Sequence, residues 1–180
     1  MPCLSYCVEI WGNTYKTNLQ PLCTLQKRAI RIINNVGYLE HTHSLFLKSH
    51  TLKFTDLVTF KTAQIMYRAR HNLLPRKWQT LFIDREGGYN LRGNLHLKQL
   101  KVRTSVRSMS RTICGVIWWN GLEQEFKQST HIIHFKRMYR NTFLENYEND
   151  LRWLKMRNDC KCMYKCKYVS RNNLQTWFQG

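Results

Sequence analysis

The sequence predicts a mainly α protein, a small helical domain with an irregular loop or a short β segment in its middle. Apolar residues recur at helical spacing in four separate segments, each preceded by residues that can cap a helix. Three glycines within residues 87–93 interrupt this pattern near the middle of the chain. Hydrophobic residues make up 43% of the 180 residues, which is enough to build a buried core.

The first strong helical segment follows Thr17 and Asn18, either of which can cap it. Pro21 is expected within its first turn, where a proline is tolerated, and Gly37 is expected to stop the helix. The predicted buried stripe is Leu22, Leu25, Ala29, Ile32, Ile33 and Val36. The opposite face carries Lys27, Arg28 and Arg31.

A short helix is predicted to begin at Thr42 and to point Leu45 and Phe46 inward. A longer helix follows, capped by Thr55 or Asp56 and ended by Leu74-Pro75, because a proline restricts the residue before it. Its predicted buried stripe is Val58, Ile65, Met66 and Ala69. The opposite face carries Lys61, Gln64, Arg68 and His71.

The glycine-rich residues 86–93 are predicted to form a loop, and the partial alternation over residues 97–104 favours a short strand or hairpin. Ser110 or Thr112 then caps an apolar helix that runs to about residue 120. Ser129 or Thr130 caps the last clear helix. Its predicted buried stripe is Ile132, Phe135, Tyr139 and Phe143, flanked by Lys136, Arg137 and Arg140.

We expect one helical domain over residues 1–147 and a divergent, flexible basic tail over residues 148–180, because no apolar stripe stays in register after Tyr147. Within the domain, the residues expected to be buried are Ile33, Ile65, Trp119 and Phe135. The tail contains Cys160, Cys162 and Cys166, but no further Cys or His follows to complete a zinc site. Free thiols are therefore the favoured interpretation.

The charge distribution indicates a polyanionic partner. Lys and Arg total 29 against 11 Asp and Glu, which gives a net charge of +18. No acidic residue occurs between positions 9 and 40, 56 and 84, or 86 and 123. Helix surfaces built for stability usually intersperse both signs, so RNA or single-stranded DNA is the expected partner, with a merely solvated basic surface as the alternative. The candidate binding residues are Lys27, Arg28, Arg31, Lys61, Arg68, Arg92 and Arg103.

Several other functional classes lack support in the sequence. No run approaches the ~18 to 20 apolar residues of a membrane span, so no membrane partner is expected. The first residues do not match a signal peptide, and seven scattered cysteines are interpreted as reduced thiols of a nuclear or cytoplasmic protein. The glycine-rich loop lacks the Lys-Ser/Thr of a P-loop, and no cofactor or metal is expected. The sequence leaves the oligomeric state open.

A set of short motifs occurs in a definite order along the chain. They are Tyr6 with Trp11-Gly12, Gln26-Lys27-Arg28 with Arg31, Leu45-Phe46, Leu74-Pro75, Tyr89 to Arg92, and Trp119-Asn120. In this order the motifs resemble the segment just after the polymerase core in LINE-type (non-LTR, jockey-like) retrotransposon reverse transcriptases. The resemblance extends to about Tyr147 and then stops.

The resemblance implies the C-terminal part of an RNA-directed DNA polymerase without its active site. Such enzymes hold two divalent ions with carboxylates, usually including an adjacent aspartate pair. The four aspartates here, at positions 56, 84, 150 and 159, are far apart in sequence, so no enzymatic activity is expected. We expect a non-catalytic fragment that binds RNA or single-stranded DNA through basic helix faces. The alternative is a helical protein-interaction module or an inert retrotransposon remnant.

Two of the resembling motifs suggest roles for individual side chains. Arg92, where the family also places an arginine, either clamps a phosphate beside a stacked base or pairs with Asp84 or Glu86. Trp119 is expected in the core, with Asn120 capping a helix or bridging backbone groups. If the two long basic helices pack core to core, their basic faces would border one groove with Arg92 at its rim.

Overall fold

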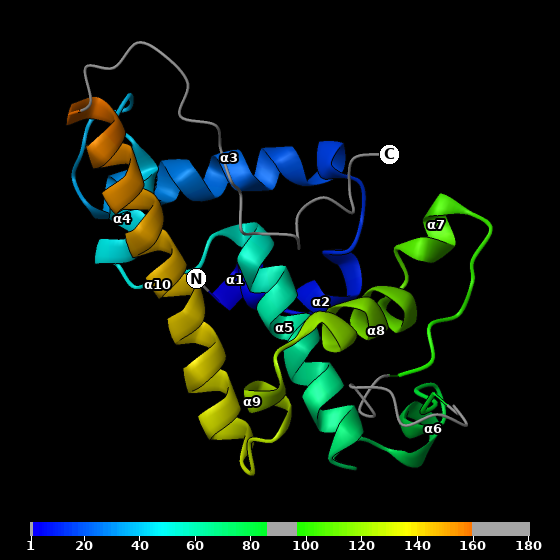
Figure 1. Ribbon diagram of the computed structural model, residues 1–180. Helices are drawn as coiled ribbons and strands as arrows, with labels where there is room; N and C mark the ends of the chain where they lie inside the picture. The colour runs from blue at the N-terminus through cyan, green and yellow to red at the C-terminus, as the bar shows by residue number, and fades with distance from the viewer. Residues whose placement is uncertain (1, 86–96, 160–180) are drawn as a thin grey trace.

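The computed structural model describes residues 2–85 and 97–159, which form a mainly helical fold (Figure 1). The structure is 67% helix with almost no strand, and the predicted fold class is confirmed. Within the described ranges, β structure is limited to an isolated antiparallel bridge between Asp84 and Leu97. The short strand or hairpin predicted over residues 97–104 reduces to this bridge.

Ten helical segments are described, several of them single turns. The first five are α1 (Pro2–Ser5), α2 (Val8–Trp11), α3 (Lys16–Ile33), α4 (Thr42–Lys48) and α5 (Phe54–Arg70). The remaining five are α6 (Arg76–Gln79), α7 (Ser105–Ser108), α8 (Arg111–Gly121), α9 (Gln124–Lys127) and α10 (Ile132–Asp159). The predicted glycine-rich loop, residues 86–93, lies outside the described residues.

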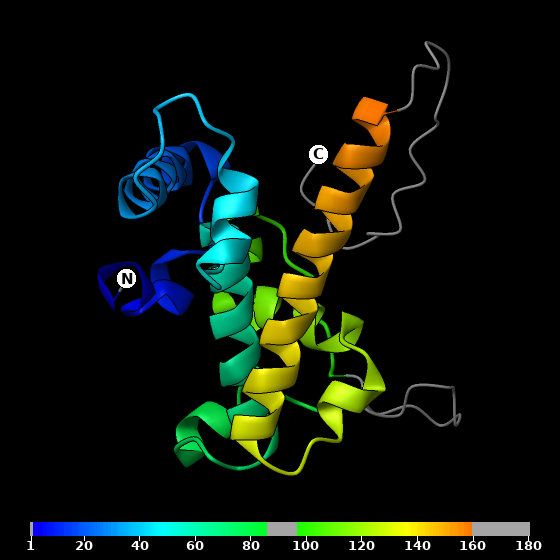
Figure 2. The ribbon, with the colours of Figure 1, turned by 90° about the vertical axis from the view of Figure 1, so that its left-hand side faces the viewer.

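Helix α5 is the central element of the fold. It contacts α2, α3, α8 and α10, which surround it in Figure 1 and in the rotated view of Figure 2. The larger core cluster lies where α5 meets α8 and α10, and it includes Met66, Tyr67, Val116, Trp119 and Phe135. The smaller core cluster lies where α2 meets the first half of α5, and it consists of Val8, Phe54 and Val58.

The four residues expected to be buried fall into three groups. Trp119 is 2% exposed and Phe135 is 0% exposed, so both predictions are confirmed. Ile65 is only half-buried. Ile33 is 62% exposed, and the prediction for this residue is wrong. It fails because α3 packs through a different face from the one that its apolar periodicity indicates.

The buried face of α3 is centred on a polar residue. Gln26 and Ile30 are buried there. They are flanked by the half-buried side chains of Leu19, Leu22 and Cys23. Leu25 and Ile32, both members of the predicted stripe, are exposed. An apolar pattern cannot reveal a face whose central position is a glutamine, because the helix is rotated to bury that side chain.

Two side-chain amides connect elements by binding both a donor and an acceptor of the main chain. Gln26 Nε2 donates to the Leu52 carbonyl at 2.9 Å, and Gln26 Oε1 accepts from the Phe54 amide at 2.8 Å. Asn120 Nδ2 donates to the Leu97 carbonyl at 2.9 Å, and its Oδ1 accepts from the Leu97 amide at 2.8 Å. The expected backbone-bridging role of Asn120 is confirmed. Buried main-chain groups need such partners wherever no helix or sheet supplies them.

Helices α3, α4 and α5 are each followed, two residues after their last helical residue, by a residue in the left-handed region. The φ angles are 51° at Asn35, 45° at His50 and 56° at Asn72. In each case the next amide donates to a carbonyl five residues back, as Val36 does to Arg31 at 3.1 Å, which is the long bond of a Schellman motif. Asparagine adopts this conformation at a lower energetic cost than most residues with a side chain, and the cost is higher for histidine than for asparagine.

Several predicted helix boundaries are wrong, and the left-handed residues account for the two that concern helix ends. Helix α3 ends at Ile33 and not at Gly37, and α5 ends at Arg70 and not at Leu74-Pro75. Helix α3 also begins before Thr17, with no side-chain cap, so Pro21 lies inside the helix and not in its first turn. The caps predicted for the two other long helices fail as well, because α5 begins before Thr55 and Asp56 and α10 begins after His131.

Tyr147, where the family resemblance ends, lies in the middle of a helix. It is buried, and α10 continues without a break to residue 159. The proposed boundary between residues 147 and 148 therefore does not coincide with a break in secondary structure. Residues 160–180, which contain the three tail cysteines, lie outside the described residues.

The Gln26 bridge is expected to be a major source of stability. Replacing Gln26 by Leu removes two hydrogen bonds and leaves the buried Phe54 amide and Leu52 carbonyl without partners. We expect Gln26→Leu to lower the free energy of unfolding by about 2 to 4 kcal/mol, measured by urea denaturation. Gln20→Leu, on the exposed side of the same helix, is the control and should change it by less than about 0.5 kcal/mol. Equal stability of the two variants would contradict the role assigned to Gln26.

The left-handed conformation of His50 gives a prediction of opposite sign. Glycine adopts this conformation without a steric cost, so His50→Gly should raise the free energy of unfolding by about 0.5 to 1 kcal/mol. Ser44→Gly, at an exposed position inside the same helix α4, should lower it by about the same amount. Thermal unfolding followed by circular dichroism measures both changes. A destabilised His50→Gly variant would show that the imidazole makes contacts that outweigh the backbone cost.

Candidate nucleic-acid interface

The predicted binding residues are spread over several elements. Lys27 and Arg28 are exposed on α3, and Arg31 is half-buried near the end of the same helix. On α5, Lys61 is half-buried and Arg68 is exposed. Arg103 is exposed in the segment before α7. Arg92 lies outside the described residues, so neither of its two interpretations is tested.

Two of these arginines line a hollow at the C-terminal end of α3. The hollow has a volume of about 470 Å³ and is lined by Arg28, Arg31, Ile32, Val36 and Tyr38. Arg31 Nε donates to the Glu40 carbonyl at 2.9 Å, and its guanidinium carbon lies 5.7 Å from the centroid of the Tyr38 ring. The Arg31 side chain is therefore held in place, while the Tyr38 ring is 68% exposed. Lys27 stands one helical turn before Arg31 on the same face.

Lys61 and Arg68 do not join this hollow. Helix α3 meets the N-terminal end of α5, because Gln26 binds the Phe54 amide there. Arg68 comes fourteen residues later in the helix, or about 20 Å along the helix axis. Arg68 therefore lies far from the end of α5 that α3 contacts, and Lys61 is not among the residues that line the hollow.

Tyr38 is the part of this site that the sequence did not reveal. It follows the helix by five residues, in a turn without helical periodicity, and only the Schellman end of α3 folds it back beside Arg31. The exposed apolar side chains of α3 and of the turn after it were also unexpected. They are Leu25, Ile32, Ile33 and Leu39. The signal in the sequence was the two asparagines at positions 34 and 35, which favour a helix end with positive φ.

The charged groups of the described residues are mostly unpaired with each other. Between residues of the described ranges, the structure gives a single ion pair, in which Arg70 binds Asp84. Lys127 is buried without a carboxylate partner in this part of the chain, and its Nζ donates to the Asn120 carbonyl at 3.3 Å. Burial lowers the pKa of the Lys127 ammonium group. Within the described ranges, the excess of positive charge is therefore not neutralised by local ion pairs.

A partly buried polar cluster joins α4, α5 and α10, and the sequence did not predict it. Tyr147 donates its hydroxyl hydrogen to Asp56, and the same hydroxyl oxygen accepts from the Lys53 amide at 3.1 Å. Lys53 Nζ donates to His43 Nδ1 at 3.1 Å, so the imidazole carries its proton on Nε2, which donates to the Tyr147 carbonyl at 3.0 Å. Lys53 Nζ also lies 4.3 Å from the centroid of the Tyr147 ring.

Burial shifts the pKa values of this cluster. It raises the pKa of the Asp56 carboxyl group, an effect that the Tyr147 hydrogen bond and the nearby Lys53 charge oppose. It lowers the pKa of Lys53, with the charges of Asp56 and Asp150 opposing that change. Burial and the Asp56 charge together raise the pKa of the Tyr147 hydroxyl well above its usual range. The cluster therefore ties three helices together at some electrostatic cost.

The described residues contain no candidate metal site and no candidate membrane-spanning helix. No group of three or more His, Cys, Asp or Glu side chains there is arranged to hold a metal ion. Among the helices over residues 2–85 and 97–159, none has the length and apolar content needed to cross a bilayer.

Comparison with known proteins gives no relative. No family model matches the chain, and no match is found among curated proteins or among solved structures. The resemblance to LINE-type reverse transcriptases therefore rests on the motifs alone.

The motifs that carry this resemblance mostly occupy structural positions in the fold. Gln26 and Asn120 are the two amides that bridge main-chain groups, and Trp119 is a core residue. Phe46 is buried. At Gly12, an added Cβ would lie 2.5 Å from the Val8 carbonyl oxygen and 2.7 Å from the Val58 side chain, so α2 and α5 approach too closely for any other residue.

The Asp56 cluster predicts a specific pH dependence of stability. Because the folded-state pKa of Asp56 is raised, its proton stabilises the fold at low pH, and this contribution is lost as the pH rises from about 4 through the folded-state pKa. Asp56→Asn stays neutral and keeps an acceptor for the Tyr147 hydroxyl. Its melting temperature should therefore fall less than that of the wild type over this rise in pH.

The comparison isolates Asp56 from the other titratable groups around it, since His43, Lys53, Tyr147 and Asp150 are present in both proteins. Glu145→Gln, which changes an exposed carboxylate on α10 whose charge is not among those that act on Asp56, is the control and should follow the wild-type curve closely. A wild type that gains stability relative to Asp56→Asn above pH 4 would contradict the assigned direction of the pKa shift.

Proposed function

We propose that this chain is a non-catalytic module that binds RNA or single-stranded DNA through the C-terminal half of α3. The observation that carries the proposal is the hollow lined by Arg28, Arg31 and Tyr38, in which the Arg31 guanidinium lies beside an exposed aromatic ring. Single-stranded nucleic acids offer phosphates for such cations and unstacked bases for such rings. Their duplex forms offer the phosphates but not the free base faces.

The chemistry of the hollow suits a partner that carries negative charge at regular spacing. Arginine binds phosphate oxygens in a bidentate manner and stacks on flat rings, so Arg28 and Arg31 can act in both ways. Lys27 extends the cationic face by one turn of the helix. The Glu40 carbonyl bond and the Tyr38 ring hold the Arg31 guanidinium in place, which reduces the conformational entropy that binding would cost.

The charge of the whole chain supports the same partner. A net charge of +18 repels itself unless counterions or a polyanion neutralise it. Binding to phosphates releases condensed counterions, so the affinity is expected to fall steeply with salt and to depend weakly on sequence. Neither contact requires a cofactor.

We place this module within the wider context that the motifs imply. The family resemblance supports a C-terminal, post-polymerase region of a LINE-type RNA-directed DNA polymerase, whose nucleic-acid partners occur in the nucleus and the cytoplasm. In that setting the module would increase the affinity of the enzyme for template RNA or target DNA. The polymerase reaction itself would belong to other parts of an intact enzyme.

A second candidate function is a helical protein-interaction module, which the exposed apolar side chains favour. Leu25 and Ile32 lie on one flank of α3, and Ile33 and Leu39 lie near its end. Exposed apolar groups gathered on one element are typical of protein-docking surfaces. This function predicts binding that strengthens with salt or ignores it, because apolar contacts do not release counterions.

The two functions are separated by a charge-removing variant of α3. Changing Lys27, Arg28 and Arg31 together to Gln should reduce the slope of log K against log salt by about 2, from a loss of about 0.7 for each single-strand phosphate contact. Fluorescence anisotropy with a labelled single-stranded RNA, at a series of salt concentrations, measures the slope. Helicity should stay at the wild-type level.

A matched control removes the same charge elsewhere. Lys48, Arg137 and Arg152 are exposed on α4 and α10, and changing all three to Gln also lowers the net charge by three. This control should alter the slope much less than the α3 variant. Equal slopes in the two variants would show that only total charge matters, and an unchanged slope in the α3 variant would remove this hollow from consideration.

A further inference from the structure

A second basic surface lies on α6, on the segment before α7, and on α7 itself. Residues 76–85 and 97–111 contain eight basic side chains, and the carboxylate among them, Asp84, is bound by Arg70. The exposed basic residues are Arg76, Lys77, Arg85, Lys98, Lys101, Arg103 and Arg107. The eighth, Arg111, is half-buried at the start of α8. We call these residues, together with Trp78, the Trp78 surface.

The centre of this surface is an aromatic ring held by an arginine. The Arg111 guanidinium carbon lies 4.8 Å from the centroid of the Trp78 ring, in a cation–π contact. Trp78 is 37% exposed although it belongs to the residue type with the largest apolar side chain. No carboxylate of the described residues forms an ion pair with Arg111. The stack therefore leaves part of the indole open to solvent beside an uncompensated positive charge.

An irregular segment carries the neighbouring cations. Residues 98–104 are neither helix nor strand and connect the bridge at Leu97 to the start of α7. Lys101 and Arg103 are exposed on either side of the half-buried Val102.

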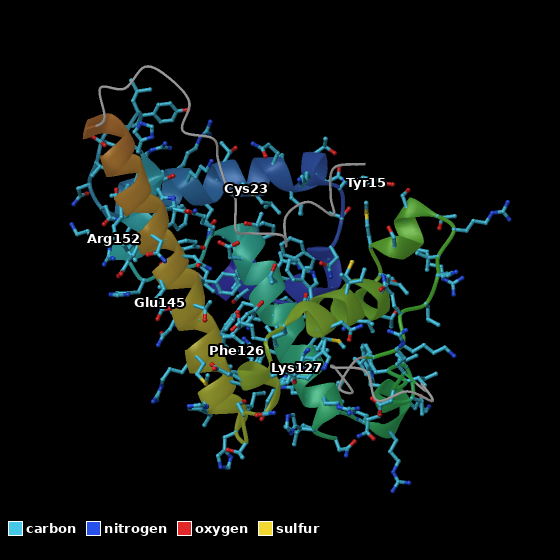
Figure 3. The ribbon with its side chains drawn as sticks, viewed as in Figure 1. Tyr15, Cys23, Phe126, Lys127, Glu145 and Arg152 are labelled. Atoms are coloured by element: carbon cyan, nitrogen blue, oxygen red, sulfur yellow. The ribbon has the colours of Figure 1, made fainter. Side chains whose placement is uncertain are left out.

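Both ends of this segment are fixed to the body of the protein. The Lys98 amide donates to the Ile83 carbonyl at 2.8 Å. The hydroxyl groups of Ser105 and Tyr15 lie 3.0 Å apart, and Figure 3 shows Tyr15 at the start of α3, facing α7. The row of cations is thus a fixed strip that runs from α6 to α7, as Figure 1 also shows for the chain path.

We propose that the Trp78 surface is a second binding site for single-stranded nucleic acid, in which one base stacks on the exposed part of Trp78 and the adjoining phosphates contact Lys101, Arg103 and Arg107. Stacking on an aromatic ring requires an unpaired base, which is why a single strand fits this surface better than a duplex. The inference rests on the proposed function for the class of partner but uses none of the α3 residues.

The test separates stacking from charge. Trp78→Leu removes the aromatic ring and no charge, and Trp78→Phe keeps a ring. With a short oligouridine RNA, Trp78→Leu should lower the affinity about tenfold and leave the slope against salt unchanged, because one stacked base is lost but no phosphate contact. Trp78→Phe should stay within about threefold of the wild type. Binding of inorganic polyphosphate, which carries charge but no bases, should be the same for all three proteins.

Each remaining outcome overturns a stated part of the idea. Unchanged oligouridine affinity in Trp78→Leu, or an equal loss for oligouridine and polyphosphate, would overturn the stacking site, the second case by showing that Trp78 only supports the basic strip. Circular dichroism must show wild-type helicity in both variants.

The α3 variant tells the two sites apart. Suppose that the α3 variant, with Lys27, Arg28 and Arg31 changed to Gln, has a flatter salt slope while Trp78→Leu binds RNA normally. That result supports the proposed function and overturns the Trp78 site. If only Trp78→Leu weakens binding, the Trp78 site stands and α3 falls. A wild type that binds neither probe would overturn both.

Discussion

The fold depends on one requirement: the main chain that connects its helices must find hydrogen-bond partners where helices cross. The turn between α4 and α5 passes under α3, and there the Gln26 amide supplies both a donor and an acceptor. Because this glutamine must face inward, it fixes the rotation of α3. That rotation in turn decides which side chains of α3 reach solvent, so a buried hydrogen-bond pair determines the composition of an outer surface.

That outer surface combines features that usually occur on different proteins. Cations and exposed apolar side chains alternate around the same helix end, next to an exposed tyrosine. Single-stranded nucleic acid is the partner whose own chemistry alternates in the same way, with charged phosphates and flat apolar bases. The Trp78 surface repeats the combination with other residues, which come from α6, from α7 and from the irregular segment before α7. Two sites of similar chemistry on separate elements would allow one strand to be bound at two points, with a gain in effective concentration.

The sequence predicted the positions of the helices well, but it predicted poorly which face of a helix is buried. Periodicity found α5, α8 and α10, and it placed Trp119 and Phe135 in the core. The buried face of α5 also includes Thr62 and Gln64, although the apolar pattern assigned Gln64 to the opposite face. Periodicity failed for α3, where the buried face contains a glutamine, and for helix ends that use Asn35 or His50 in place of glycine. The individual cations could be named, but their grouping could not. Tyr38 reaches Arg31, and Arg111 reaches Trp78, only through turns and contacts between elements that no local pattern encodes.

The long-range position of α10 has a consequence for the order in which the molecule assembles. Gln26 binds Leu52 and Phe54, which follow it by 26 and 28 positions in the sequence. Tyr147, in contrast, binds the Lys53 amide across a separation of 94 positions. Closing short loops costs less entropy, so α3, α4 and α5 can associate early and α10 docks late. During synthesis on a ribosome, the face of α5 that carries Met66 and Tyr67 would stay uncovered until Phe135 emerges. A nascent chain halted before that point would expose the apolar core face of α5 to solvent. Docking of α10 is therefore the step that turns an aggregation-prone intermediate into a folded domain.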